Sequence, residues 1–195
     1  MSSGPNDPSD VVLVDAEEEE RLRWARVAAP VGPIVVVASD AGLRRLSFDG
    51  GRRPLAPAPD WIEDRAALAE PVEQLRAFFA GALRRFELDL DAPGTDFQRS
   101  VWAAVAAIPY GETASYADVA LAAGRPRASR AVGAANGANP LPIVVPCHRV
   151  VGADGSLTGF AGGLEAKRWL LAHEAEHAGP TGRRQRFAAD QLALF

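Results

Sequence analysis

The residue of this chain with the most distinctive chemistry is Cys147, the only cysteine among 195 residues. A lone thiol can form neither an internal disulfide nor a multi-cysteine zinc site, so these scaffold roles are excluded. Pro146 precedes it, and His148 and Arg149 follow. Cationic neighbours favour the thiolate, which is the nucleophilic form of sulfur. Residue types alone leave two interpretations, a buried core cysteine or a nucleophile, and this setting favours the nucleophile.

The distribution of charge around Cys147 indicates an anionic partner. The net charge is −4, but residues 1–20 hold seven acidic residues and no basic one. Removing these seven from the 25 acidic residues leaves 18 against 21 basic ones. Residues 119–153 contain no Asp or Glu, yet hold four arginines: Arg125, Arg127, Arg130 and Arg149. The alternative is an Ala- and Gly-rich stretch that happens to lack acids. We favour an electropositive face suited to phosphates.

The composition is that of an ordinary globular protein, with 48% hydrophobic and 24% charged residues. No apolar run reaches transmembrane length, and the N-terminus has no basic region followed by an apolar one. We therefore expect a cytoplasmic protein without membrane contact. The length allows one medium domain or two small ones.

Two groups of elements are predicted to position the cysteine. In the first, β-rich runs at 24–29, 34–39 and 43–48 predict an antiparallel meander, followed by a helix over 66–80 and a further strand over 86–90. The turn at 91–94 is the predicted boundary. We expect a disordered acidic leader (1–22), an α/β domain (23–92), a second domain (93–178) and a flexible tail (179–195).

The second group is predicted to be helical. Thr95 with Gln98, and Ser115 with Asp118, form capping boxes that begin two helices. The second of these is predicted to reach Ala123 and to be closed by Gly124. A third helix, with Pro126 in its first turn, is predicted to reach Gly137, so the last two form the outline of a helix-turn-helix. A final helix is predicted over 165–173, with core candidates Leu164, Trp169 and Leu170.

Six blocks of residues carry a resemblance to a known family. One runs from Asn-Pro-Leu-Pro-Ile at 139–143 to Pro-Cys-His-Arg-Val at 146–150. The others are Phe-Gln-x-x-Val-Trp (97–102), Ser-Tyr (115–116), Arg-Ala-Val-Gly (130–133), Gly-Phe-Ala-Gly-Gly (159–163) and Trp-Leu-Leu-Ala-His-Glu (169–174). In this order they resemble the O6-alkylguanine-DNA alkyltransferases, or methylated-DNA–protein-cysteine methyltransferases. The resemblance implies an α+β fold, in which a small ribonuclease H-like domain precedes a winged-helix-like catalytic domain.

The resemblance also implies a reaction and the residues that perform it. An alkyl group on guanine O6 of double-stranded DNA moves irreversibly to Cys147, once per molecule and without a cofactor. A water joins the cysteine to His148, which Glu174 orients. Tyr116 gives a proton to the leaving guanine, and Asn139 braces the turn that holds the cysteine. The implied base pocket consists of Pro140, Arg149, Val150, Phe160 and Ala161, and a structural role is the alternative for Arg149. Several relatives have Tyr where this chain has Phe160. Whether O4-alkylthymine is also a substrate is left open.

Because O6 is buried in duplex DNA, the nucleotide must be extruded from the stack. The resemblance implies that Arg130 fills the space left behind and that its helix enters the minor groove. The small residues Ala131, Gly133 and Ala134 suit a narrow groove; the alternative is tight packing against another helix. Arg125 and Arg127 complete the predicted DNA-binding set.

Two other functions compete for the same residues. His173-Glu174-x-x-His177 fits a zinc-protease signature, but no third ligand is evident, and we predict no metal. A non-catalytic sensor of alkylated DNA would share the fold, but such proteins lack the cysteine.

The tail ends in Gln191, Leu192, Ala193, Leu194 and Phe195. It resembles the pentapeptide with which bacterial repair proteins dock on the DNA sliding clamp, the alternative being a frayed terminus. We expect a monomer.

Overall fold

The computed structural model of the chain describes residues 21–52 and 54–179. Its elements in chain order are β1 (Arg23–Val27), β2 (Ile34–Ser39), β3 (Gly42–Phe48), β4 (Ile62–Glu63), α1 (Ala69–Phe79), α2 (Asp96–Ala106), β5 (Ala114–Ser115), α3 (Tyr116–Ala122), α4 (Ser129–Gly137), the 3-10 turn η1 (Cys147–Arg149), β6 (Val150–Val151) and α5 (Gly163–His177). The predicted leader lies almost entirely outside the described residues, and so does the tail with its candidate clamp peptide.

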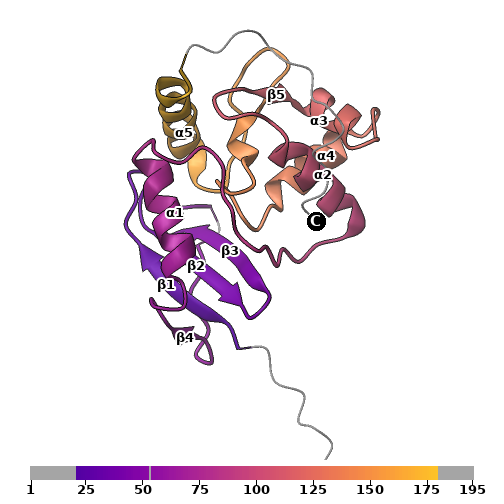
Figure 1. Ribbon diagram of the computed structural model, residues 1–195. Helices are drawn as coiled ribbons and strands as arrows, with labels where there is room; N and C mark the ends of the chain where they lie inside the picture. Colours follow the sequence, from indigo (N-terminus) through magenta and orange to yellow (C-terminus); the bar gives the residue numbers. More distant parts are fainter. Residues whose placement is uncertain (1–20, 53, 180–195) are drawn as a thin grey trace, which may run out of the picture.

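The N-terminal sheet is the predicted meander with one addition. β1 pairs antiparallel with β2, and β2 pairs antiparallel with β3. β4 joins the free edge of β1 in parallel and completes the order β3-β2-β1-β4. Residues 34–37 in the central strand are all buried, because both faces of that strand are covered. Helix α1 lies along this sheet (Figure 1) and buries Leu75 and Phe78.

The prediction of a strand over 86–90 is wrong. Exposure does alternate along this segment, but only Leu90 forms a bridge, with Leu43. The backbone of Glu87 instead exchanges hydrogen bonds with the side chain of Gln74 on α1, at 2.8 and 2.9 Å. A side chain of the helix thus takes the place of a neighbouring strand.

The second half is a helical cluster (Figure 1), and both predicted capping boxes are present. Thr95 and Gln98 begin α2, and Ser115 and Asp118 begin α3. Gly124, with φ +69°, lies in the turn between α3 and α4. The start of α4 differs from the prediction: the helix begins at Ser129, so Pro126 lies in the preceding turn.

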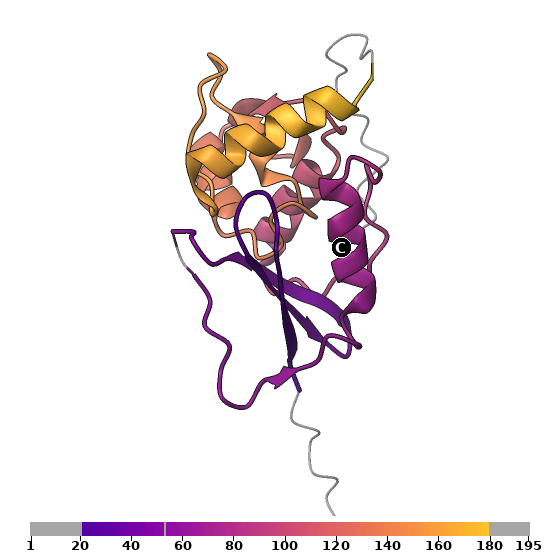
Figure 2. The same ribbon diagram turned by 90° about the vertical axis from the view of Figure 1, so that its left-hand side faces the viewer.

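Helix α5 lies across the helical cluster and reaches the end of α1 (Figure 2). It runs one turn beyond its predicted end, to His177. Of its core candidates, Leu170 is fully buried, whereas Leu164 is 43% exposed. Within the described ranges, none of the helices combines the length and apolar character that crossing a bilayer would need.

Candidate active site

A short, tightly braced turn delivers Cys147 to the interior, where it begins η1 and is 4% exposed. Asn139 holds the approach to this turn: its amide nitrogen donates to the Val145 carbonyl at 2.8 Å, and its side-chain oxygen accepts from the Leu141 N–H at 2.9 Å. Ile143 within this segment has φ +81°. A β-branched residue is strained in that region, so its neighbours must hold it there. The predicted bracing contact of Asn139 is therefore present in the geometry.

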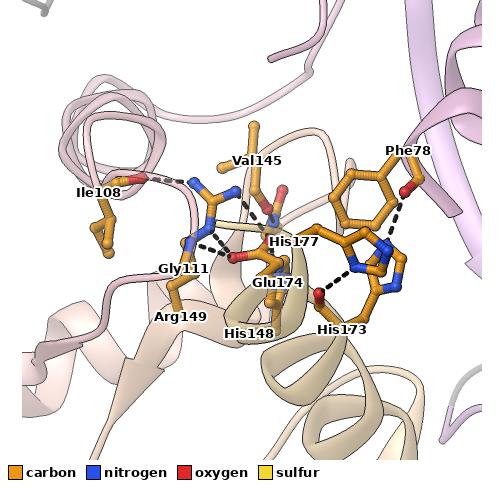
Figure 3. Close-up of polar contacts among 10 residues, drawn as sticks. Phe78, Ile108, Gly111, Val145, His148, Arg149, His173, Glu174 and His177 are labelled. Atoms are coloured by element: carbon orange, nitrogen blue, oxygen red, sulfur yellow. Dashed lines mark hydrogen bonds and ion pairs between the residues drawn. The ribbon is translucent and has the colours of Figure 1, made fainter. Parts of the chain in front are cut away.

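Behind the cysteine, His148 and Arg149 converge on the carboxylate of Glu174 (Figure 3). His148 Nε2 lies 2.8 Å from Glu174 Oε1, and Arg149 donates through Nε and Nη2 at 2.8 and 2.9 Å. The Gly111 N–H adds a fourth bond at 3.0 Å. The Glu174 carboxylate is completely buried, and each of its two oxygens accepts two of these four hydrogen bonds, so all its lone pairs are used inside the protein.

The electrostatics of this cluster define the state of His148. Burial alone would raise the pKa of Glu174, but the hydrogen bond from His148 and the charge of Arg149 prevail and lower it to about 2. Burial lowers the pKa of His148, against the hydrogen bond to Glu174 that raises it. An ionised carboxylate can only accept, so Nε2 carries the imidazole proton. Nδ1 then has the free lone pair, and it is buried without a partner among the described residues.

The sulfur sits in a different electrostatic environment. Burial raises the pKa of the Cys147 thiol to about 11, although the hydrogen bond from Asn139 and the charge of Lys167 act in the opposite direction. Lys167 is fully buried on α5 and donates to the carbonyls of Val150 and Thr158, at 2.6 and 3.0 Å. Burial lowers the pKa of this ammonium, while Cys147 raises it.

Tyr116 is positioned by the small second sheet. β5 pairs in parallel with β6, Ala114 opposite Val150 and Ser115 opposite Val151. This pairing sets the first residue of α3, Tyr116, beside the segment that follows the cysteine. Its hydroxyl lies 2.7 Å from Thr158 Oγ1, just before the loop 159–163.

The N-terminal domain supports the loop 159–163 directly. The Arg52 N–H donates to the Ala161 carbonyl at 2.9 Å. Phe160 is 5% exposed, and its ring packs edge-on against Phe48 at 5.4 Å between centroids. Its ring centroid also lies 6.2 Å from that of His148. A Cβ on Gly162 would come within 3.0 Å of the Phe48 ring, so the close approach of the two domains depends on glycine there.

The other predicted pocket residues have separate positions. Pro140 is half-buried, and its carbonyl accepts from the Leu46 N–H at 2.8 Å; Val150 is fully buried. Arg149, for which the resemblance implied either a place in the pocket or a structural role, directs its guanidinium to Glu174 and to the Ile108 carbonyl. Its contacts are those of a residue that anchors the carboxylate.

One face of α4 is exposed and, apart from Arg130, carries only small residues. Arg130, Ala131 and Ala134 are exposed, whereas Val132, Ala135 and Asn136 are buried on the opposite face. Gly133 lies between them, where an added Cβ would be 3.7 Å from the Tyr116 ring. Trp102 of α2 anchors the buried side by donating to the Ala135 carbonyl at 2.9 Å. The arginines of this region are exposed and form no ion pair within residues 21–52 and 54–179: Arg125, Arg127 and Arg130.

The H-E-x-x-H residues are engaged in packing and in the carboxylate cluster. His173 Nε2 donates to the Phe78 carbonyl and His177 Nδ1 to the His173 carbonyl, both at 2.8 Å (Figure 3). Glu174 is held by His148 and Arg149. The His173 contact thereby joins α5 to the end of α1, whereas the His177 contact stays within α5. These arrangements disagree with the zinc-protease alternative.

Sequence reasoning missed Lys167 and Thr158. A lysine on a surface helix is usually solvated, but Lys167 lies three residues before Leu170 and seven before Glu174, on the buried stripe of α5. That helical spacing is the signal that could have revealed it. Thr158 has no comparable signal, because its contact with Tyr116 joins residues 42 positions apart.

Comparisons with known proteins match nearly all of the described chain. The ribonuclease-like domain of 6-O-methylguanine DNA methyltransferase matches residues 22–92, and the DNA-binding domain of the same family matches residues 96–176. Methylated-DNA–protein-cysteine methyltransferases from Methanosarcina barkeri and Mycolicibacterium paratuberculosis are each 48% identical, over 76% and 80% of this chain and 94% of each relative.

Solved structures agree with these matches. The Mycobacterium tuberculosis O6-methylguanine methyltransferase is 43% identical, with a TM-score of 0.74 over 82% of this chain and 96% of that one. A structure described as Mycobacterium tuberculosis OGT in complex with DNA is 44% identical, with a TM-score of 0.73 over 80% of this chain and 94% of that one.

Proposed function

Because the chain belongs to the 6-O-methylguanine DNA methyltransferase family, we propose that Cys147 is the residue that accepts the alkyl group from guanine O6. The activity of the chain is alkyl transfer from DNA to a cysteine of the protein itself, which reverses the damage directly. The observation that carries the assignment is the position of the only cysteine, buried in the turn that also bears the Glu174-bound His148.

The first step is the removal of the thiol proton. Burial raises the pKa of Cys147 to about 11, so the thiol is protonated at neutral pH and needs a base. A water between the sulfur and the free Nδ1 of His148 would carry the proton to the imidazole, and Glu174 would stabilise the resulting imidazolium. The low pKa of Glu174 supports this role, because the carboxylate stays ionised throughout the working pH range.

The second step is displacement at carbon. The thiolate attacks the alkyl carbon, an S–C bond forms, and the C–O6 bond breaks with its electron pair on guanine. Tyr116 protonates the leaving base. Pro140, Val150, Phe160 and Ala161 would enclose the base, and the tightly packed Phe160 ring supports stacking without the hydroxyl that a tyrosine would add. The thioether has no route back to a thiol, so each molecule acts once.

Access to the base requires extrusion of the nucleotide, and the exposed face of α4 is suited to that task. Its small residues Ala131 and Ala134 would let the helix approach the minor groove closely. Arg130 would fill the vacated space, and Arg125 and Arg127 would neutralise phosphates. Their exposure and lack of described carboxylate partners support these roles.

Intact-protein mass spectrometry tests the proposal. After incubation with a duplex that carries one O6-methylguanine, we expect a gain of one methyl group per molecule, located on Cys147. Cys147→Ser is the matched control and should gain none. A protein that binds the lesion tightly without gaining mass would be a damage sensor, and the assignment of Cys147 would be wrong.

Three finer proposals rest on the sequence: the protein is a monomer, its two domains meet at 91–94, and residues Gln191–Phe195 form a clamp-binding peptide. Deletion of residues 191–195 should abolish binding to the DNA sliding clamp and leave alkyl transfer intact. Equal clamp binding by the shortened chain would refute the peptide's role. The same mass assay, with O4-methylthymine in the duplex, decides whether that base is a second substrate.

A further inference from the structure

Thr158 is held from two sides at the entrance to the loop 159–163. Its hydroxyl lies 2.7 Å from the hydroxyl of Tyr116. Its backbone carbonyl accepts a hydrogen bond from the buried ammonium of Lys167 at 3.0 Å. Lys167 also donates to the Val150 carbonyl at 2.6 Å. The threonine backbone is thus tied to the strand that follows the nucleophile, and its hydroxyl lies against that of Tyr116.

The geometry points to Thr158 as a positioning residue for Tyr116: we propose that its hydroxyl donates to the tyrosine oxygen and leaves the phenolic proton directed at the leaving guanine. This inference rests on the proposed role of Tyr116. A hydroxyl has one proton and two acceptor lone pairs. If Tyr116 donated to Thr158, its proton would be committed and would have to be redirected during the reaction. With Thr158 as donor, the phenol is ready before the base arrives.

The same hydrogen bond assists the transfer itself. As the C–O6 bond breaks, the phenolic O–H bond also breaks and its proton goes to guanine, so negative charge develops on the Tyr116 oxygen. A hydrogen bond to a charged oxygen is stronger than one to a neutral oxygen, so the Thr158 contact strengthens in the transition state. Water then returns a proton to the tyrosine, and His148 releases to water the proton that it took from the thiol. The net movement is one proton from sulfur to guanine.

Substitution of Thr158 separates this role from a purely structural one. Thr158→Val keeps the shape and removes the hydroxyl, whereas Thr158→Ser keeps the hydroxyl and is the matched control. With an O6-methylguanine duplex at saturating protein, we expect Thr158→Val to lower the single-turnover rate by about 10- to 100-fold. Its affinity for the duplex and its melting temperature should stay close to those of the unmodified chain. Thr158→Ser should retain most of the rate.

A Tyr116→Phe background completes the test. There the phenol is absent, so Thr158→Val should cause no further loss of rate. An unchanged rate in Thr158→Val overturns the inference, and so does an equal loss with and without the Tyr116 hydroxyl. A normal rate in Tyr116→Phe alone would instead show that Tyr116 is not the proton donor. That result would refute the proposed role of Tyr116, and with it the inference about Thr158.

Discussion

Replacement of Glu174 by Gln should destabilise the protein by about 3 kcal/mol at neutral pH. The carboxylate accepts from His148, from two nitrogens of Arg149 and from the Gly111 N–H. An amide has only one acceptor oxygen, so some of these donors would face an NH₂ group. The pKa of Glu174 falls from an ordinary value of 4.5 to about 2. At 1.36 kcal/mol per unit, this shift is worth about 3 kcal/mol of folding free energy.

The pH dependence gives the sharper measurement. A carboxyl whose pKa is lowered by folding contributes its full stabilisation above its unfolded value of 4.5, and loses it as the pH falls toward about 2. Urea unfolding of the original chain and of Glu174→Gln should therefore differ most above pH 5 and converge on acidification. Glu176→Gln is the matched control, because Glu176 lies two residues after Glu174 but is exposed. It should behave like the original chain. Equal stability at pH 7, or a difference that persists unchanged down to pH 3, would refute the reasoning.

Two further predictions concern the nucleophile and the DNA face. The ultraviolet absorbance of the thiolate is measured as the difference between the chain and Cys147→Ser. It should rise with a midpoint near pH 11, because burial raises the pKa of Cys147 to about that value. A midpoint below pH 8 would contradict this. Arg130→Ala should slow repair of duplex DNA by about tenfold or more, because extrusion costs a few kcal/mol, and should spare a single-stranded substrate. Arg76→Ala on α1 is the control for the loss of an exposed charge, and equal slowing on both substrates would show that Arg130 does not act in extrusion.

The features predicted well from the sequence are those that local chemistry determines. The capping boxes at Thr95 and Ser115 depend on side chains three residues apart, so the sequence contains everything needed to locate them. The strands of the meander follow β-rich runs bounded by turns, and β2 coincides with its predicted range of 34–39. The family and the α+β fold were also recognisable, because six blocks in a fixed order carry information that no single block has.

The errors arise where a distant partner decides the structure. The segment 86–90 has the alternation of a strand, but Gln74 of α1 takes both backbone hydrogen bonds of Glu87, and only Leu90 forms a bridge, with Leu43. β4 has only two residues, too few for a pattern, and exists because β1 offers it a free edge. The contacts of Arg149 also depend on a distant partner: its guanidinium binds a carboxylate 25 positions away, which its neighbours in sequence do not indicate.

In the proposed reaction, Lys167 and Glu174 lie where their charges favour transfer of the buried thiol's proton to the buried imidazole. They lie seven residues apart on α5, two turns along one face, and both are fully buried. The ammonium lowers the pKa of Cys147, and the carboxylate raises that of His148. Burial acts against both charged forms, raising the pKa of the thiol and lowering that of the imidazole. If a thiolate–imidazolium pair formed, the positive ammonium of Lys167 would favour the thiolate and the negative carboxylate of Glu174 would favour the imidazolium. Both charges come from one helix. Burial keeps the resting thiol protonated. Because the charges of Lys167 and Glu174 are in place before DNA binds, the proposed transfer of the thiol proton needs no rearrangement of α5.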